Sequence, residues 1–254
     1  MKLIHAVLLG ILEGVTEFLP VSSTGHLILA SALLGLTESE FLKTFEIAIQ
    51  LGAILSVVVL YGKALLKDRE MIQKVIVAFI PTGILGLLFY KIVKHYLLGS
   101  EKVVVAALVL GGIFLILFER YHLHPEGEDA KKISYKQAAL IGTIQSLAMI
   151  PGVSRSASTI IGGLLLGVER KTIVEFSFLL ALPTMAAATG LDLLKTAPAF
   201  SAGQIEALAA GFAVSFVVAM LSIKFLLRFI QNHSFISFGI YRIAVGVLFW
   251  WILL

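Results

Sequence analysis

The densest group of chemically active side chains lies between residues 13 and 26. Glu13 and Glu17 are spaced i, i+4, which puts both carboxylates on one face of a helix, roughly 6 Å apart. In a low-dielectric setting both cannot ionise cheaply, so either one holds a proton or a divalent cation lies between or beside them. The structural alternative is a polar pair that only packs helices together.

A hydroxyl and an imidazole follow these acids, just after Pro20. We expect Ser22 or Ser23 to cap a restarting helix, whose free N–H groups, together with Ser22 and Thr24, would form an anion site. His26 lies three residues after Ser23 on the same helical face, so Ser23 is a candidate nucleophile with His26 beside it. Alternatively, His26 itself attacks or protonates the leaving group. A third interpretation leaves the serines as caps and His26 as an interhelical hydrogen-bonding group.

A second polar cluster follows Pro151 and contains Ser154, Arg155, Ser156 and Thr159. The arginine is permanently charged, and its fork of donors suits phosphate oxygens. If the two clusters meet in the fold, acids, nucleophile and arginine converge on one anion site. Such a site indicates phosphoryl-transfer chemistry. A salt bridge between Arg155 and one of the two acids is the structural alternative, and it is compatible with catalysis.

The elements that position these residues must lie in lipid. Of the 254 residues, 59% are apolar and only 14% are charged, and the mean hydropathy is +0.99. Soluble domains have roughly 45–50% apolar and about 25% charged residues. The sequence therefore predicts an all-α polytopic membrane protein. Because cysteine is absent, disulfides and thiolate chemistry are excluded.

Six apolar runs are predicted to span the membrane, and two further segments are not simple spans. Segments 3–35 and 137–167 are each interrupted by a proline and a polar cluster, which a lipid-facing helix cannot accommodate because the freed backbone groups would lack partners. Each is predicted to be a re-entrant helix–loop–helix hairpin. The predicted spans are 43–62, 71–95, 102–119, 172–195, 204–230 and 235–254.

The two interrupted segments resemble each other at an offset of 132 residues. This offset superposes Gly10 on Gly142 and Ser22 on Ser154. Each half then consists of one hairpin and three spans, an odd number, so the second half begins on the opposite face. The sequence thus predicts a single membrane domain with an inverted-topology repeat. Its parts are repeat 1 (about 1–119), a cytoplasmic connector (about 120–136) and repeat 2 (about 137–254).

Charge distribution predicts the orientation. Twelve Lys and Arg residues fall on the face that carries the connections at 62–71, 119–137, 167–172 and 228–235, and six fall on the other face. The positive-inside rule then places the first face in the cytoplasm and both termini outside. We expect a multi-pass protein of the plasma (inner) membrane whose active site opens to the extracytoplasmic side. The net charge of +4 is scattered over helix ends, which is not typical of a nucleic-acid partner.

Two other groups of polar residues are expected to be structural. Arg242 lies within the last span, and we expect a salt bridge to Glu175 or Asp192. His122 and His124 lie with acidic residues in the connector, where a solvated loop is favoured over a metal site.

Two motifs carry a resemblance to a known family. The residues Glu-Gly-Val-Thr-Glu-Phe-Leu-Pro-Val-Ser-Ser-Thr-Gly-His at 13–26, and Pro-Gly-Val-Ser-Arg-Ser at 151–156, resemble the signatures of the bacitracin-resistance type undecaprenyl-diphosphate phosphatases. The likeness extends over essentially the whole chain. The second motif of the family often has Gly-Ala where this chain has Ala157-Ser158.

The resemblance implies an activity and a set of site residues. The family removes the terminal phosphate of undecaprenyl diphosphate, recycles the lipid carrier for peptidoglycan and uses a divalent cation, usually Mg²⁺ or Ca²⁺. Its acids match Glu13 and Glu17, and its catalytic serine and histidine match Ser23 and His26. Its phosphate clamp matches Ser154, Arg155 and Thr159. The sequence does not exclude a homodimer.

A polyprenyl-phosphate flippase or secondary transporter is the rival interpretation. Inverted repeats and broken helices suit it equally well. A carrier, however, has no need for a nucleophile, acids and an arginine in one site.

Overall fold

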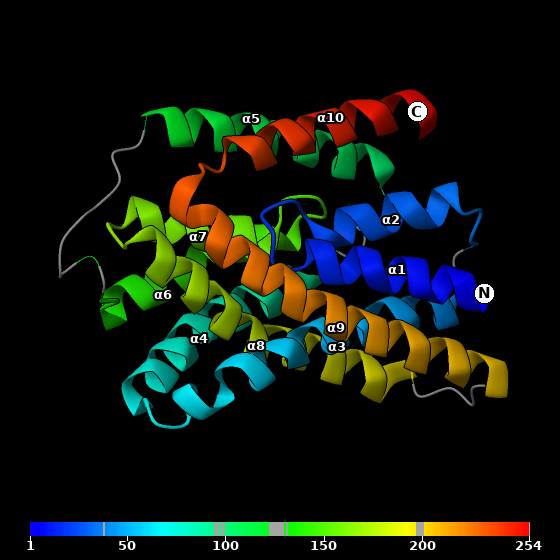
Figure 1. Cartoon of the computed structure of the whole chain (residues 1–254), viewed down its shortest axis with the longest axis horizontal. Helices are drawn as coiled ribbons and strands as arrows, with labels where there is room; N and C mark the ends of the chain where they lie inside the picture. The colour runs from blue at the N-terminus through cyan, green and yellow to red at the C-terminus, as the bar shows by residue number, and fades with distance from the viewer. Residues whose placement is uncertain are drawn as a thin grey trace.

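The computed structural model describes residues 1–37, 39–93, 97, 100–121, 130, 132–196 and 201–253. Within these residues the chain is helical, without strands, which confirms the predicted all-α class. The elements (Figure 1) are α1 (Leu3–Thr16), α2 (Ser23–Leu33), α3 (Glu40–Leu65), α4 (Arg69–Ile92), α5 (Glu101–Tyr121), α6 (Tyr135–Gln145), the short 3-10 helix η3 (Ser146–Met149), α7 (Arg155–Leu165), α8 (Arg170–Thr196), α9 (Ala202–Asn232) and α10 (Ile236–Leu253).

Each predicted element has a counterpart in the fold. The six predicted spans correspond to α3, α4, α5, α8, α9 and α10, and the two interrupted segments form the helix pairs α1–α2 and α6–α7. Among the described residues, α3, α4, α5 and α9 contain stretches long and apolar enough to cross a membrane. Most of the predicted connector, including His122 and His124, lies outside the described residues.

The first helix of each pair packs against the other half of the chain. Helix α1 packs on α9, and α6 packs on α4. Glycines permit both approaches: a Cβ at Gly10 would lie 2.6 Å from the Gly211 carbonyl oxygen, and one at Gly142 would overlap that of Ala78. Close backbone contact at small residues is how helices associate in lipid, where tails are as apolar as leucine.

The loops between the paired helices end in the same backbone conformation. We call residues 17–22 the first tip and residues 150–154 the second tip. Ser22 and Ser154 have φ angles of 72° and 80°, a region that residues other than glycine rarely occupy. The Ser22 hydroxyl accepts a hydrogen bond from the N–H of Gly25, and the Ser154 hydroxyl accepts one from that of Ala157. Each serine is therefore a helix N-cap, and of the two predicted caps of the first restarting helix, Ser22 or Ser23, it is Ser22.

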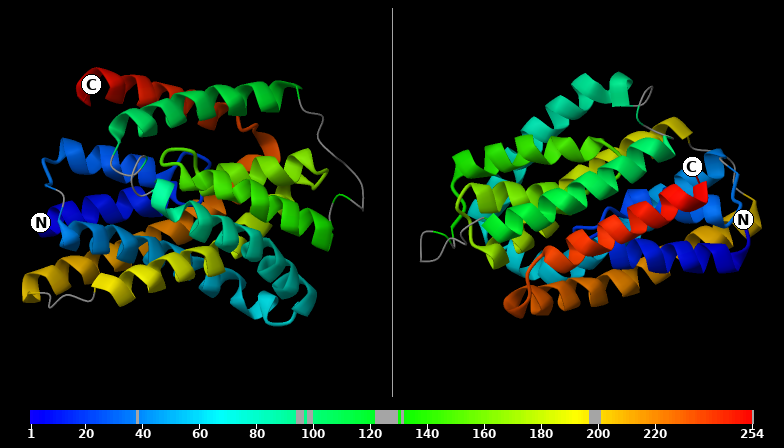
Figure 2. Two further views of the ribbon diagram at one scale, coloured as in Figure 1. Left: turned by 180° about the vertical axis from the view of Figure 1, so that it is seen from behind. Right: turned by 90° about the horizontal axis from the view of Figure 1, so that it is seen from above.

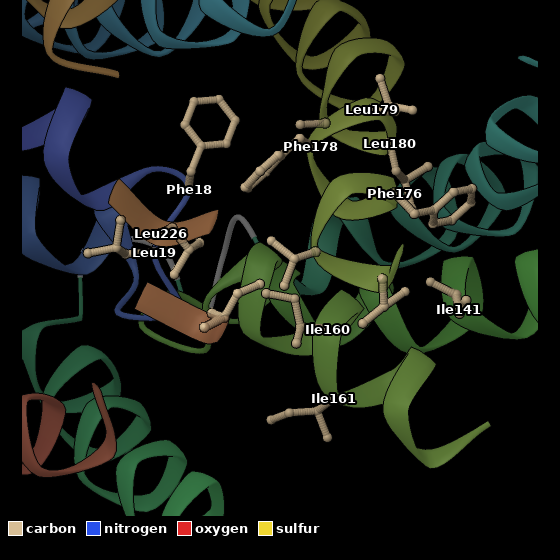
Figure 3. Close-up of a cluster of buried hydrophobic side chains, with 14 of the residues drawn as sticks. Phe18, Leu19, Ile141, Ile160, Ile161, Phe176, Phe178, Leu179, Leu180 and Leu226 are labelled. Atoms are coloured by element: carbon tan, nitrogen blue, oxygen red, sulfur yellow. The ribbon is translucent and has the colours of Figure 1, made fainter. Parts of the chain in front are cut away.

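An apolar core lies beneath the tips. Phe18 of the first tip and Phe178 of α8 are fully buried and meet edge-to-face, with ring centroids 5.2 Å apart. Figure 3 shows these two rings together with residues from α6, α7 and α9, among them Ile160. Because Phe18 directly follows Glu17, this packing fixes the backbone of the first tip next to an ionisable side chain.

The arrangement of helix ends gives the molecule two distinct ends. Both ends of the described chain lie at one end of the molecule, whereas the α3–α4, α7–α8 and α9–α10 connections lie at the other (Figures 1 and 2). Helices α5 and α10 run side by side along one flank. The two tips meet in the interior, about midway between the ends (Figure 1).

Candidate active site

The two tips enclose a cavity of about 200 Å³. Both tips, both helices that restart after them, and helices α4, α6 and α8 contribute to its wall. The lining residues are Glu17, Ser22, Ser23, Thr24, Thr82, Gln145, Ala148, Met149, Pro151, Gly152, Ser154, Arg155, Thr184 and Met185. Six of the predicted site residues therefore share one cavity: Glu17, Ser22, Ser23, Thr24, Ser154 and Arg155.

Glu17 joins the two tips through its carboxylate. The Ser23 hydroxyl donates to Glu17 Oε2 at 2.5 Å, and Arg155 Nη2 donates to Glu17 Oε1 at 2.6 Å. Both members of the ion pair are largely buried, since the side chains of Arg155 and Glu17 are 11% and 5% exposed. Charge-assisted hydrogen bonds of this kind are shorter and stronger than neutral ones. A hydroxyl, a carboxylate and a guanidinium are thus connected in one chain of hydrogen bonds.

Arg155 is held on three sides and keeps one free donor. Its Nη1 donates to the Ser177 carbonyl oxygen at 3.0 Å, and its guanidinium carbon lies 5.8 Å from the Phe18 ring centroid. Its buried Nε has no hydrogen-bond partner among the described residues. Because Arg155 lines the cavity, its fixed positive charge can attract an anion there.

Both restarting helices direct their N-termini to this cavity. Helix α2 begins at Ser23 and α7 at Arg155, and both residues line the cavity. The first N–H groups of a helix have no partner within the helix and carry the positive end of its dipole. Two such ends together with a guanidinium make an anion site suited to phosphate.

Among the described residues, the hydrogen bonds of the His26 ring go to Ser22 and Tyr241 and not to Ser23. Its Nδ1 lies 2.8 Å from the Ser22 carbonyl oxygen and its Nε2 lies 2.9 Å from the Tyr241 hydroxyl. The rings of His26 and Tyr241 also stack: their planes are nearly parallel and their centroids lie 5.5 Å apart. Since both ring nitrogens are engaged elsewhere, Glu17 is the base that the geometry offers to Ser23.

Two predicted phosphate ligands support the tips and do not line the cavity. The Ser156 hydroxyl donates to the Leu19 carbonyl oxygen at 2.7 Å and so ties the second tip to the first. The Thr159 hydroxyl lies 2.9 Å from the Arg155 carbonyl oxygen and 3.2 Å from Gln145 Oε1. Both side chains hold the backbone that carries Arg155.

Glu13 lies one helical turn before Glu17 and does not line the cavity. It is fully buried, and neither of its oxygens accepts a hydrogen bond from the described residues. Orphaned carboxylate oxygens next to an anion site suit a hard cation, which commonly uses one or two carboxylates plus substrate phosphate oxygens. Within the described residues, no three His, Cys, Asp or Glu side chains lie close enough to form a metal site by themselves.

Arg242 does not form the salt bridge with Glu175 that was one of the two predicted alternatives. Its guanidinium donates to five backbone carbonyl oxygens, and Glu175 is not among its partners. The side chain of Asp192 lies outside the described residues. Carbonyl dipoles can solvate a buried cation without a carboxylate, and a sequence gives no sign of such carbonyls.

Comparison with known proteins identifies the family to which these features belong. A family model described as Bacitracin resistance protein BacA matches residues 6–248. The chain belongs to this family. It is 53% identical over 252 residues to a protein of Sulfurihydrogenibium sp. named undecaprenyl-diphosphatase, with 98% of this chain and 99% of the relative covered. Proteins of the same name from Aquifex aeolicus and Thermus thermophilus are 51% identical over 246 residues and 48% identical over 248 residues. These matches cover 96% of this chain in both cases, and 96% and 95% of the respective relatives.

The site of this BacA-family chain also contains residues that the sequence did not single out. The Gln145 amide donates to the hydroxyls of Thr82 and Thr184 at 3.0 and 3.2 Å, which forms a polar wall opposite the tips. The 132-residue offset places Gln145 on Glu13, and that match was the available signal for its importance. No motif marked Tyr241.

Proposed function

We propose that this chain hydrolyses undecaprenyl diphosphate to undecaprenyl phosphate and inorganic phosphate. The family membership and the names of its relatives support this substrate. The observation that carries the chemistry is the Glu17 carboxylate, which accepts hydrogen bonds from Ser23 and Arg155 at a cavity lined by both tips.

In the proposed first step, Ser23 Oγ attacks the terminal phosphorus while Glu17 accepts its proton. The new Oγ–P bond replaces the bridging P–O bond, and undecaprenyl phosphate leaves. Arg155 and the N–H groups that open α2 and α7 stabilise the charge on the transferred group. Catalysis of this kind depends mainly on positioning and electrostatics.

Between the two proposed steps, Glu17 releases the proton from Ser23 to the departing undecaprenyl phosphate. In the proposed second step, water attacks the phosphoserine and gives one proton to Glu17, which passes it to Ser23 Oγ. The Oγ–P bond breaks, Ser23 regains a proton and inorganic phosphate is released. His26 keeps the Ser22 carbonyl in place throughout. Since Glu17 contacts both the attacking hydroxyl and the arginine, one side chain serves both steps.

We propose that a divalent cation, Mg²⁺ or Ca²⁺, is held by Glu13 and Glu17 together with phosphate oxygens. The unpartnered oxygens of Glu13 support this assignment. When bound, such a cation neutralises charge on the phosphate oxygens. Glu17 still has lone pairs beyond the two that Ser23 and Arg155 use.

We further propose six spans and two re-entrant hairpins in an inverted repeat, with the tips near the membrane midplane. The first helix of each pair packs against a helix of the other half of the chain, α1 on α9 and α6 on α4, and this symmetry supports the repeat. The position of both ends of the described chain at one end of the molecule supports their placement on the same side of the membrane, and the Lys and Arg distribution favours the outside. A role in peptidoglycan synthesis and bacitracin resistance, in the inner membrane, follows from the proposed substrate. Homodimerisation is a further proposal without support from the described contacts.

Phosphate release from undecaprenyl diphosphate by the purified chain in detergent tests the function. We expect turnover by the wild-type chain and near-complete loss in Glu17→Ala and Arg155→Ala. The exposed Arg228 of α9 provides a matched control, Arg228→Ala, which should keep wild-type turnover. If the folded wild-type chain moves labelled prenyl phosphate across vesicles but releases no phosphate, the transporter interpretation replaces this proposal.

A further inference from the structure

Arg242 of α10 is a fully buried cation that touches both tips. Its side chain is 1% exposed, and every hydrogen bond described for it goes to a backbone carbonyl oxygen. The acceptors are Pro20 in the first tip (3.2 Å), Gly152 and Val153 in the second tip (2.9 and 3.1 Å), and Ala107 and Leu108 in α5 (3.0 and 3.4 Å).

Three of the five carbonyls that Arg242 binds lie in the tips, where the broken helices leave them without helical partners. Pro20 lies three residues before Ser23, and Val153 lies two residues before Arg155. Irregular backbone at membrane depth must have its polar groups satisfied by protein or trapped water. Because one planar guanidinium has five donors in a fixed fork, it can satisfy carbonyls from both tips in one geometry. The separation of the tips is thereby tied to a single rigid group.

Helix α5 is shaped to receive this side chain. A Cβ at Gly111 would overlap the Arg242 Nη2 atom, and a Cβ at Gly112 would lie 3.1 Å from the Arg242 Cβ. Gly152 adopts a φ of +93°, and a Cβ there would lie 2.7 Å from the Val104 carbonyl oxygen. Gly111 thus makes room for the guanidinium, Gly112 for the Cβ of Arg242, and Gly152 for the close approach of the second tip to α5.

The residue next to Arg242 contacts the same region. Tyr241 hydrogen-bonds to His26, which in turn binds the Ser22 carbonyl oxygen. Two consecutive residues of α10 therefore contact the first tip, one directly and one through the histidine. Arg242 itself does not line the cavity, so it does not contact a phosphate there.

We propose that Arg242 is a positioning residue that sets the distance between the two tips and so aligns Ser23 with Arg155 for phosphoryl transfer. The expected change in kcat rests on the proposed phosphatase activity, but the expected change in the distance between the tips does not. A misplacement of about 1 Å can lower turnover about 100-fold. Lysine cannot replace the arginine fully, because its donors lie on one atom and cannot reach carbonyls on several sides.

The kinetic test compares Arg242→Lys and Arg242→Ala with the exposed control Arg228→Lys. We expect kcat for phosphate release to fall about 100-fold in Arg242→Ala and by an intermediate factor in Arg242→Lys. We expect KM to stay within about threefold, because ground-state contacts in the cavity are kept. Gly111→Ala, which displaces the guanidinium without removing it, should lower kcat in the same way. Wild-type kcat in all three variants, or a raised KM at unchanged kcat, overturns the proposal.

A distance measurement separates the positioning role from the activity. The chain has no cysteine, so Val15→Cys on α1 and Leu147→Cys on η3, both exposed, allow spin labels beside each tip. We expect a narrow distribution of distances between the two spin labels when Arg242 is kept, and a broader or shifted distribution in the labelled chain with Arg242→Lys or Gly111→Ala. An unchanged distribution in folded variants overturns the proposal whatever their kcat. If the wild-type chain releases no phosphate but the distribution broadens, the proposed function fails and the positioning role stands.

Discussion

Replacing Glu17 with glutamine removes one acceptor from a side chain that serves two donors. The carboxylate accepts from Ser23 at 2.5 Å and from Arg155 at 2.6 Å, one donor on each oxygen. Glutamine has nearly the same shape but only one acceptor oxygen, and its NH₂ group can only donate. Either the Ser23 hydroxyl or the Arg155 guanidinium therefore faces the glutamine NH₂ group, which is a donor, in place of an acceptor. The variant also loses the carboxylate that accepts the Ser23 hydroxyl, which is the base in the proposed mechanism.

The expected loss is that of a general base. Removing such a group lowers turnover about 10²–10⁴-fold, which corresponds to about 2.7–5.4 kcal/mol in the barrier at about 1.36 kcal/mol per tenfold. Folding should suffer less, because glutamine still fills the site and keeps one of the two hydrogen bonds. We thus expect kcat to fall far more than the apparent unfolding temperature.

A double-mutant cycle tests the connection between the two residues. Phosphate release is measured for Glu17→Gln, Ser23→Ala and the double variant, with the exposed Glu206→Gln of α9 as control. If Glu17 acts through Ser23, the double variant is no slower than Ser23→Ala alone, because residues that act as a unit are non-additive. Fully multiplicative losses, or a Glu17→Gln variant within threefold of wild type, would refute the proton transfer from Ser23 to Glu17.

Further predictions concern packing, the cation and the tip conformation. Gly142→Ala should destabilise the protein by about 1–3 kcal/mol, because its Cβ would overlap the Ala78 carbonyl. Gly62→Ala, whose Cβ meets only a side chain at 3.7 Å, should leave thermal unfolding in detergent unchanged or slightly raised. Chelation of divalent cations should abolish turnover, and added Mg²⁺ or Ca²⁺ should restore it. The variant Glu13→Gln should raise the half-saturating metal concentration. Full activity in the presence of chelator would remove the cation from the mechanism. Ser154→Gly should change stability by less than about 1 kcal/mol, because relief of the positive φ offsets the lost cap; a loss above about 2 kcal/mol contradicts that balance.

The elements and the positions of the two tips along the chain were predictable because their signals are local, whereas the meeting of the tips was a condition linked to the inverted repeat. Apolar runs mark the long helices, and a proline followed by serines marks each tip. The hydrogen bond between Glu17 and Arg155 was foreseen only as an alternative, since any buried arginine near an acid invites that pairing.

The supports of the site were not predictable because they use backbone groups. Arg242 was assigned an acidic partner, but its partners are carbonyls whose directions depend on three segments far apart in the chain. His26 has a helical spacing from Ser23 that suggests contact, yet its ring turns to Tyr241, more than 200 residues away. The polar wall around Gln145 likewise depends on how α4 and α8 pack.

The packing of α1 and α6 against helices of the other half of the chain has a consequence for biosynthesis. Gly10 of α1 packs against Gly211 of α9, about 200 residues later, whereas α6 finds its partner α4 already made. Chains emerge from the ribosome in order, at about 5–20 residues per second. The N-terminal hairpin must therefore wait, incompletely covered, for at least ten seconds until α9 is inserted. A nascent chain that ends after α8 should expose α1 to proteases and membrane chaperones, and one that includes α9 should not.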